Sequence, residues 1–312
     1  MRLAYISHPS VEQHEAGPHH PESPDRLKAI SKRLVASDLH PSLDFHTPPA
    51  ADREQLLRVH TAEHVDRIYD TAPKQGYAAL DGDTIMNPYS LEAALRAAGG
   101  LAHAVRLVLG DGPKSAFCAV RPPGHHAERD RAMGFCLFNN IAVGAAHALE
   151  TYGLTRVAIV DFDVHHGNGT ENIFAGDDRV LFCSSFQHPH YPGTGHGRTA
   201  NNIVNVPLPA GTAGDRYHPA VETAWLSRIA DFQPQLLMFS AGFDAHRDDP
   251  LAGMNLREED FARVTRTCLK AATPSCAGRV VSALEGGYNL HALAAGVEAH
   301  VRALLDPHPG GV

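Results

Sequence analysis

The chain has 312 residues, of which 43% are hydrophobic, and this is enough apolar material for one large core. It carries 27 Lys and Arg residues against 35 Asp and Glu residues, which gives a formal net charge of −8 at pH 7. This acidic balance argues against a protein that binds nucleic acid directly, because such proteins need a basic face for the phosphates.

Strand-like and helix-like segments alternate along the chain. The predicted strands cover residues 3–7, 115–120, 156–164, 180–185, 203–207, 236–241 and 279–284. Several are continuous apolar runs, typical of parallel strands buried on both faces. The predicted helices begin near residue 24 and then cover 90–110, 139–149, 215–229, 257–272 and 290–305. This alternation predicts a single α/β domain over residues 1–306, with a parallel sheet between two layers of helices and a flexible tail at 307–312.

The sequence shows no disulfide pattern, signal peptide or membrane-spanning segment, and these features bear on the cellular compartment. The five cysteines are odd in number, widely spaced and free of any Cys-x-x-Cys pair, which favours a reducing compartment and buried thiols. The N-terminal residues contain no long apolar segment typical of a signal peptide. No apolar run approaches the roughly 18 residues of a membrane span. We therefore expect a cytoplasmic protein that does not enter a membrane.

Polar motifs follow four of the predicted strands. They are RPPGHH (121–126), DFDVHHGNG (161–169), AGFDAH (241–246) and EGGY (285–288). In an open parallel sheet the carboxyl ends of the strands share one edge, and ligands bind there. We therefore expect these four motifs to form one site.

The segment after the third predicted strand is typical of a metal site. If the strand continues to residue 164, alternation places Asp161, Asp163 and His165 on one face. Asp244 from another strand end completes an Asp-His-Asp set. Oxygen and nitrogen ligands with an open position suit catalytic Zn²⁺, and Fe²⁺ or another first-row ion also fits. The alternative is that these residues only cap helices and close turns.

The other two motifs carry groups suited to acid–base chemistry. His125 and His126 lie in a loop set by two prolines and a glycine, and two adjacent imidazoles can supply a general base and an electrostatic partner. Asp161 and Asn168 are candidate partners that would orient the two rings. After Gly286 and Gly287, Tyr288 can donate a hydrogen bond to a developing oxyanion, unless it is only a packing residue.

Together these segments resemble the zinc-dependent histone deacetylase superfamily, which includes acetylpolyamine amidohydrolases and acetoin-utilisation proteins. The matching segments are RPPGHH (121–126), GFCLFNN (134–140), VDFDVHHGNGT (160–170), SAGFDAH (240–246) and EGGY (285–288), with HPESPDRL (20–27) and YPGTG (191–195). The HHGNGT form is similar to class II. The resemblance implies the arginase/deacetylase-like α/β fold, with a central parallel sheet of about eight strands and helices on both faces.

The resemblance also implies roles for individual residues. The Zn²⁺ ligands would be Asp163, His165 and Asp244, and the catalytic groups would be His125, His126 and Tyr288, assisted by Asp161 and Asn168. Asn168 stands where one branch has Asp, so His126 would be less basic than beside a carboxylate. One structural K⁺ site would use Asp161, Asp163, His165 and Ser184, and a second would use the main-chain carbonyls of Phe174, Asp177 and Val180.

The implied reaction is hydrolysis of an acetyl amide at the end of a tunnel. The tunnel residues would be Gly134, Phe135, Tyr191, Leu251, Gly286 and Gly287, with Asp81 and Asp83 at the rim. At least one of these two aspartates is expected instead to cap a helix or close a turn. Leu251 matches a rim position where polyamine-selective members use an acidic residue. This favours Nε-acetyl-lysine in peptides or proteins as the substrate, over a small acetylated amine or another acyl-lysine.

Some alternatives stay open or are disfavoured. A non-enzymatic relative would be expected to lack one of the catalytic groups, yet His125, His126 and Tyr288 are all present. A two-manganese arginase-like hydrolase would need further carboxylates. The segment SSFQHPH (184–190) departs from the family pattern, and His188, His190 and His196 in this loop are expected to be surface residues. The sequence sets neither the oligomeric state nor the choice between zinc and iron.

Overall fold

Eight short strands pair side by side, all parallel, in the computed structural model, which describes residues 2–306. Their order across the sheet is β2-β1-β5-β10-β9-β6-β7-β8. The strands are β1 Leu3–Ile6, β2 Leu43–His46, β5 Ser115–Cys118, β6 Val157–Asp161, β7 Val180–Gln187, β8 Ile203–Leu208, β9 Leu236–Ala241 and β10 Val280–Leu284. The sequence analysis missed β2, because this edge strand has only four residues and its Phe45 is exposed, so it shows no apolar run.

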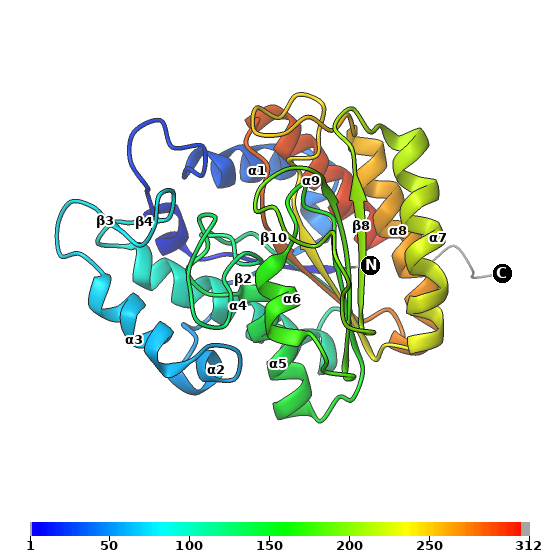
Figure 1. Cartoon of the computed structure of the whole chain (residues 1–312), viewed down its shortest axis with the longest axis horizontal. Coiled ribbons are helices and arrows are strands. Elements are labelled where there is room, and N and C mark those ends of the chain that lie inside the picture. The colour runs from blue at the N-terminus through cyan, green and yellow to red at the C-terminus, as the bar shows by residue number, and fades with distance from the viewer. Residues whose placement is uncertain (1, 307–312) are drawn as a thin grey trace.

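Helices cover both faces of the sheet, as Figure 1 shows. Those in the described residues are α1 Asp25–Ala36, α2 Arg53–Leu57, α3 Ala62–Thr71, α4 Ser90–Leu109, α5 Asn140–Tyr152, α6 Asn168–Phe174, α7 Gly214–Phe232, α8 Glu258–Cys276 and α9 Leu290–Leu305, with 3-10 turns at Pro9–Glu12 and His40–Ser42. A two-stranded ribbon, β3 Ala78–Ala79 and β4 Ile85–Met86, lies apart from the main sheet.

The alternation of side chains along each strand divides the core into two layers. On β6, Ala158 and Val160 pack into the layer formed with α1, α7, α8 and α9. Val157 and Ile159 point to the opposite layer, formed with α2, α3, α4 and α5. Because both faces are covered, the central strands are largely apolar, and this explains the apolar runs seen in the sequence.

Strand β6 ends at Asp161, three residues before the predicted end at 164. Carboxylates take over the backbone hydrogen bonds from this point: Asp163 N donates to Asp161 Oδ1 at 3.1 Å, and Val164 N donates to Asp244 Oδ1 at 2.9 Å. The chain therefore leaves the sheet and turns. The predicted alternation of Asp161, Asp163 and His165 on one strand face is wrong, although the turn still brings them together.

The start of α5 anchors the loop that carries the two adjacent histidines. The side chain of Asn139 accepts a hydrogen bond from Ala142 N at 3.0 Å and so caps the helix. Its amide nitrogen donates to Ala127 O at 3.1 Å and to Thr170 Oγ1 at 3.2 Å. One buried side chain thus ties α5 both to the 121–131 loop and to α6.

All five cysteines are buried and free of disulfides, as the sequence predicts. Among residues 2–306, no helix combines the length and apolarity needed to cross a membrane. The predicted flexible tail at 307–312 lies outside the described residues.

Candidate active site

Two strand ends supply a compact group of potential metal ligands. Asp163 and His165 come from the turn after β6, and Asp244 comes from the loop after β9. His165 Nδ1 lies 3.0 Å from Asp163 Oδ1 and 3.2 Å from Asp244 Oδ2, and one ligand atom from each residue falls within 4.8 Å of the others. Asp244 Oδ2 is buried, and its 3.2 Å contact with His165 Nδ1 is the one polar contact that the structure shows for it. An oxygen so poorly satisfied in an Asp-His-Asp set fits a divalent cation.

The electrostatics of this group favour bound positive charge. Burial opposes protonation of His165, but hydrogen bonds to the Asp163 and Asp244 carboxylates outweigh it and raise the pKa of His165 to about 10. The pKa of Asp244 is also raised, first by burial and then by the negative charge of Asp163. Two carboxylates therefore share a dry site, and a cation there would relieve their repulsion.

Two glycines make room for the carboxylates. Gly286 N donates to Asp163 Oδ2 at 2.8 Å, and a Cβ at this position would lie 2.1 Å from Asp244 Oδ2. A Cβ at Gly242 would lie 2.1 Å from Asp163 Oδ2. Any side chain at either position would displace a candidate ligand, and this gives the Gly-Gly of the EGGY segment a packing role.

The two adjacent histidines have the partners predicted from the sequence. His125 Nδ1 donates to Asp161 Oδ2 at 2.9 Å, and His126 Nδ1 donates to Asn168 Oδ1 at 2.7 Å. The two rings lie 4.0 Å apart. Burial disfavours charge on both, but their surroundings differ. Asp161 and Asp163 raise the pKa of His125 well above its ordinary value, whereas burial and the charges of His125 and His165 lower the pKa of His126 well below it. The pair thus holds one charged and one neutral imidazole, and the neutral ring of His126 can accept a proton.

Glu285 holds the loop that carries these histidines, and the sequence analysis did not single it out. Its Oε2 accepts hydrogen bonds from Gly124 N at 2.7 Å and His125 N at 3.1 Å, while its Oε1 accepts one from Ser240 Oγ at 3.0 Å. Burial raises its pKa to about 7. In the sequence, Glu285 is the first residue of the EGGY motif and an acidic residue at the end of an otherwise apolar strand.

A second residue that the sequence analysis missed, Arg26, supports the tyrosine. The Arg26 guanidinium lies 5.1 Å from the ring centroid of Tyr288 and donates to Gly287 O at 2.7 Å. Glu22 pairs with Arg26 at 3.1 Å, and both side chains are fully buried. Burial keeps the pKa of Tyr288 well above its ordinary value, so the hydroxyl remains a hydrogen-bond donor.

Of these groups, His125, His126, His165, Gly286 and Tyr288 line one narrow pocket of about 180 Å³. It is lined by Asp83, Pro123, His125, His126, Gly134, Phe135, His165, His190, Tyr191, Leu251, Gly286 and Tyr288. Five of the six predicted tunnel residues are in this lining, and Gly287 lies behind it against Arg26. Gly134 must lack a side chain, because a Cβ there would lie 2.5 Å from the His126 ring.

One of the two rim aspartates closes a turn, as the sequence analysis expected for at least one of them, whereas one histidine of the loop after β7 lies at the pocket. Asp83 lines the pocket, but Asp81 does not: its Oδ1 accepts hydrogen bonds from Asp83 N and Thr84 N and closes a turn. His190 is partly buried and lines the pocket rather than lying free at the surface. Its ring stacks 5.1 Å from the His165 ring, and its Nε2 donates to Leu251 O at 3.1 Å. The loop folds back over the turn after β6, and local sequence spacing does not reveal such a return.

His188 and His196 stack on each other at 4.4 Å and are partly or fully exposed. The sequence prediction that these two histidines lie at the surface is therefore in line with their positions.

The two predicted monovalent-cation sites differ in their fit. At the first, Ser184 pairs with Asp161 across β6 and β7, and Ser184 Oγ is buried with no hydrogen-bond partner. An unpartnered oxygen beside a carboxylate fits a cation. At the second, the carbonyls of Phe174, Asp177 and Val180 do converge, but on the side-chain amide of Asn202.

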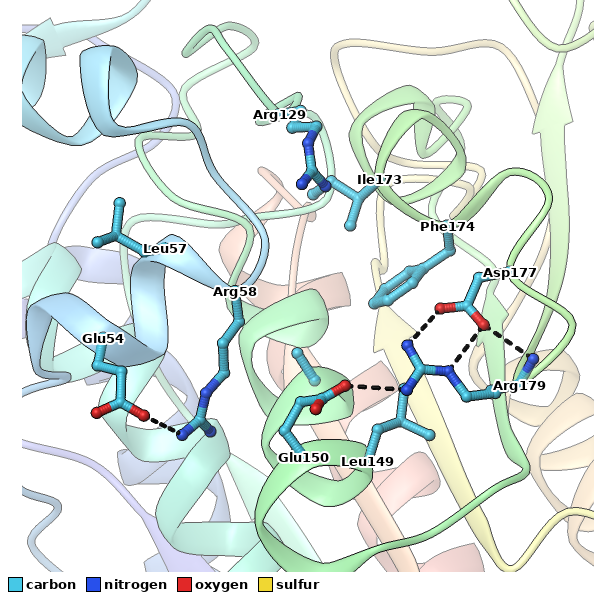
Figure 2. A pocket seen from close by; sticks show the side chains of 11 residues that line it. Glu54, Leu57, Arg58, Arg129, Leu149, Glu150, Ile173, Phe174, Asp177 and Arg179 are labelled. Carbon is cyan, nitrogen blue, oxygen red and sulfur yellow. Dashed lines mark hydrogen bonds and ion pairs between the residues drawn. The ribbon is translucent and has the colours of Figure 1, made fainter.

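A larger open groove of about 670 Å³ lies between α2, α5 and α6 (Figure 2). Phe174 and Asp177 border it, while none of the catalytic candidates does. Its charged side chains are largely paired: Arg58 with Glu54 at 3.0 Å, and Arg179 with Glu150 and Asp177 (Figure 2). The chemistry of the site is therefore confined to the narrower pocket.

The fold is an α/β domain with an eight-stranded parallel sheet. At the carboxyl edge of this sheet lie an Asp-His-Asp group, two adjacent histidines and a tyrosine. This combination defines a hydrolase of the deacetylase class. Residues 20–304 match the histone deacetylase domain, and the chain belongs to that family.

Individual relatives agree with this placement. The chain is 37% identical over 300 residues to the histone deacetylase-like amidohydrolase of Pseudomonas aeruginosa, covering 88% of this chain and 79% of the relative. It is 35% identical over 350 residues to type-2 histone deacetylase 2 of Dictyostelium discoideum, covering 96% of this chain but only 20% of that protein. The crystal structure of the HDA15 HD domain superposes with a TM-score of 0.90 at 36% identity, covering 98% of this chain and 89% of that one.

Proposed function

We propose that this protein is a zinc-dependent amidohydrolase that removes the acetyl group from Nε-acetyl-lysine in peptides or proteins. The observation that carries the proposal is the pocket itself. Its walls include Phe135 and Tyr191, and its lining also includes His126, His165 and Tyr288. Aromatic walls suit an unbranched aliphatic stem, and the polar groups suit the amide at its end.

Each group has a role in the proposed reaction. Asp163, His165 and Asp244 would hold Zn²⁺, which as a Lewis acid polarises the amide carbonyl and lowers the pKa of water. His126 accepts the proton from the attacking water as the new C–O bond forms. It then delivers this proton to the amine nitrogen as the C–N bond breaks, so that acetate and a free amine leave.

His125 and Tyr288 stabilise the charge that develops. His125, held by Asp161, keeps its positive charge beside the reacting centre. The Tyr288 hydroxyl donates to the oxyanion. The pKa of His125 is raised and that of His126 is lowered, which supports a charged role for His125 and a base role for His126.

We also propose one structural K⁺ at the first monovalent site, with ligands from Asp161, Asp163, His165 and Ser184. The buried, unpartnered Ser184 Oγ supports it. A cation there would also offset the negative charge of the buried carboxylates beside it.

The choice of substrate depends on the pocket wall. Leu251 lines the pocket and offers no charge to a second ammonium group, which favours acetyl-lysine over an acetylated polyamine. A second candidate is a small acetylated amine, because Asp83 lines the same pocket with a carboxylate.

The experiment compares turnover of an acetyl-lysine peptide and an acetylated polyamine by the zinc-loaded protein, with a chelator control. We expect chelator-sensitive turnover of the peptide, and we expect Leu251→Glu to shift kcat/KM towards the polyamine. Turnover of the polyamine alone would overturn the substrate assignment. A zinc-bound protein that hydrolyses neither would show that the acyl group or the leaving amine is wrong, and longer acyl-lysines would be tested next. Loading with iron in parallel decides which metal supports the higher rate.

A further inference from the structure

One buried side chain occupies the centre of the turn between α6 and β7. Asn202 precedes β8, and its amide nitrogen lies 2.8 Å from Phe174 O, 3.2 Å from Asp177 O and 2.9 Å from Val180 O. These are the three main-chain carbonyls that the family resemblance assigns to a second K⁺. Asn202 is only 6% exposed, so the contact is inside the protein.

The hydrogen-bonding capacity of the turn is already used. Phe174 O also accepts from Asp177 N at 3.0 Å, and Asp177 O also accepts from Val180 N at 3.0 Å. A carbonyl oxygen has two lone pairs, so both oxygens are fully engaged. Asn202 Oδ1 accepts from Gly176 N at 2.9 Å, which satisfies the other end of the same amide. An ion at this position would have to displace the amide.

We propose that the side-chain amide of Asn202 takes the place of the second monovalent cation, so that this chain binds such an ion at the first site only. The amide presents two N–H groups with partial positive charge to oxygens that would otherwise face a cation. The contrast with the first site is direct, because Ser184 Oγ is buried there without any partner. The first predicted site thus has a buried oxygen without a hydrogen-bond partner, whereas the second is occupied by the Asn202 side chain.

This arrangement bears on the catalytic loop. Helix α6 begins at Asn168, which accepts from His126, and ends at Phe174, whose carbonyl Asn202 holds. The side chain of Asp177 pairs with Arg179 at the groove (Figure 2). The C-terminal end of α6 is therefore held by hydrogen bonds from the residue before β8 rather than by an exchangeable ion. This inference does not depend on which amide the enzyme hydrolyses.

The first test locates monovalent ions directly. Crystals of the wild-type protein and of Asn202→Ala are soaked in Tl⁺, a heavy substitute for K⁺, and anomalous scattering locates the bound ions. We expect no Tl⁺ between Phe174 O and Val180 O in the wild-type protein, and an ion there in Asn202→Ala. A Tl⁺ ion at those carbonyls in the wild-type protein would overturn the proposal.

The second test measures stability in solution and needs no crystal. Thermal unfolding is followed in KCl and in N-methylglucamine chloride at equal ionic strength, with Asn201→Ala as the control because Asn201 is the exposed neighbour. Without K⁺, Asn202→Ala should lower Tm by roughly 5 °C, since it removes buried hydrogen bonds.

K⁺ bound at the first site should raise the Tm of the wild-type protein, Asn201→Ala and Asn202→Ala by the same amount. In Asn202→Ala, K⁺ should raise Tm further, because an ion can now bind at the second site as well. A loss of Tm that K⁺ does not relieve beyond this shared rise would show that Asn202 is an ordinary turn residue, and the proposal would fail.

Discussion

His126 is hydrogen-bonded to a neutral partner, and replacing Asn168 by Asp tests how far a carboxylate there would raise its pKa. His126 Nδ1 donates to Asn168 Oδ1 at 2.7 Å. Burial and the positive charges of His125 and His165 hold the pKa of His126 well below its ordinary value. A carboxylate at hydrogen-bond distance would favour the protonated ring and raise its pKa by about 1–3 units, or roughly 1.4–4 kcal/mol.

The structure shows that the single substitution would introduce a second effect. Asn168 Nδ2 donates to Glu128 Oε1 at 2.6 Å, so the second oxygen of an Asp would face that carboxylate. Two negative charges this close destabilise the fold and also change the field at His126. Combining Asn168→Asp with Glu128→Gln restores a donor–acceptor pair and isolates the effect on His126.

The assay is the pH dependence of kcat/KM for the metal-loaded enzyme. His126 must be neutral to accept a proton, so its protonation defines the acidic limb of the profile. In the double variant we expect this limb to move to higher pH by about 1–3 units. Glu128→Gln alone is the matched control and should leave the limb near its wild-type position. An unmoved acidic limb in the double variant would refute the assignment of His126 as the base.

Three further predictions concern single residues. Tyr288→Phe should lower kcat by ~10²–10³ while metal content stays unchanged, and wild-type turnover would remove Tyr288 from the mechanism. Asp244→Ala should lower the bound zinc measured by mass spectrometry, whereas retained stoichiometric zinc would contradict the ligand assignment. Glu285→Gln should alter the pH dependence of stability in the chelator-treated protein. The folded-state pKa of Glu285 is about 7 against 4.5 when unfolded, so the wild-type unfolding free energy falls as pH rises between these values, by about 3 kcal/mol. Urea titrations of both proteins should show this fall only in the wild-type protein, and equal slopes would exclude ionisation of Glu285 as its cause.

Local patterns in the sequence predicted the fold class and placed the polar motifs at one edge of the sheet, while the roles of single residues came from the resemblance to the family. The apolar runs and their alternation with helical segments predicted a parallel sheet, because strands covered on both faces must be apolar throughout. The strand-end motifs predicted which side chains meet, because the carboxyl ends of parallel strands share one edge. The pairings of His125 with Asp161 and of His126 with Asn168 were among these predictions.

Tertiary structure decided which groups support that chemistry. Arg26 reaches Gly287 across 261 residues, and Glu285 reaches Gly124 across 161. Asn202 fills a turn whose carbonyls come from a different part of the chain. Strand β6 also ends early because distant carboxylates compete for its backbone N–H groups. Such contacts depend on how buried polar atoms find partners after the chain has folded, and no local period in the sequence encodes this.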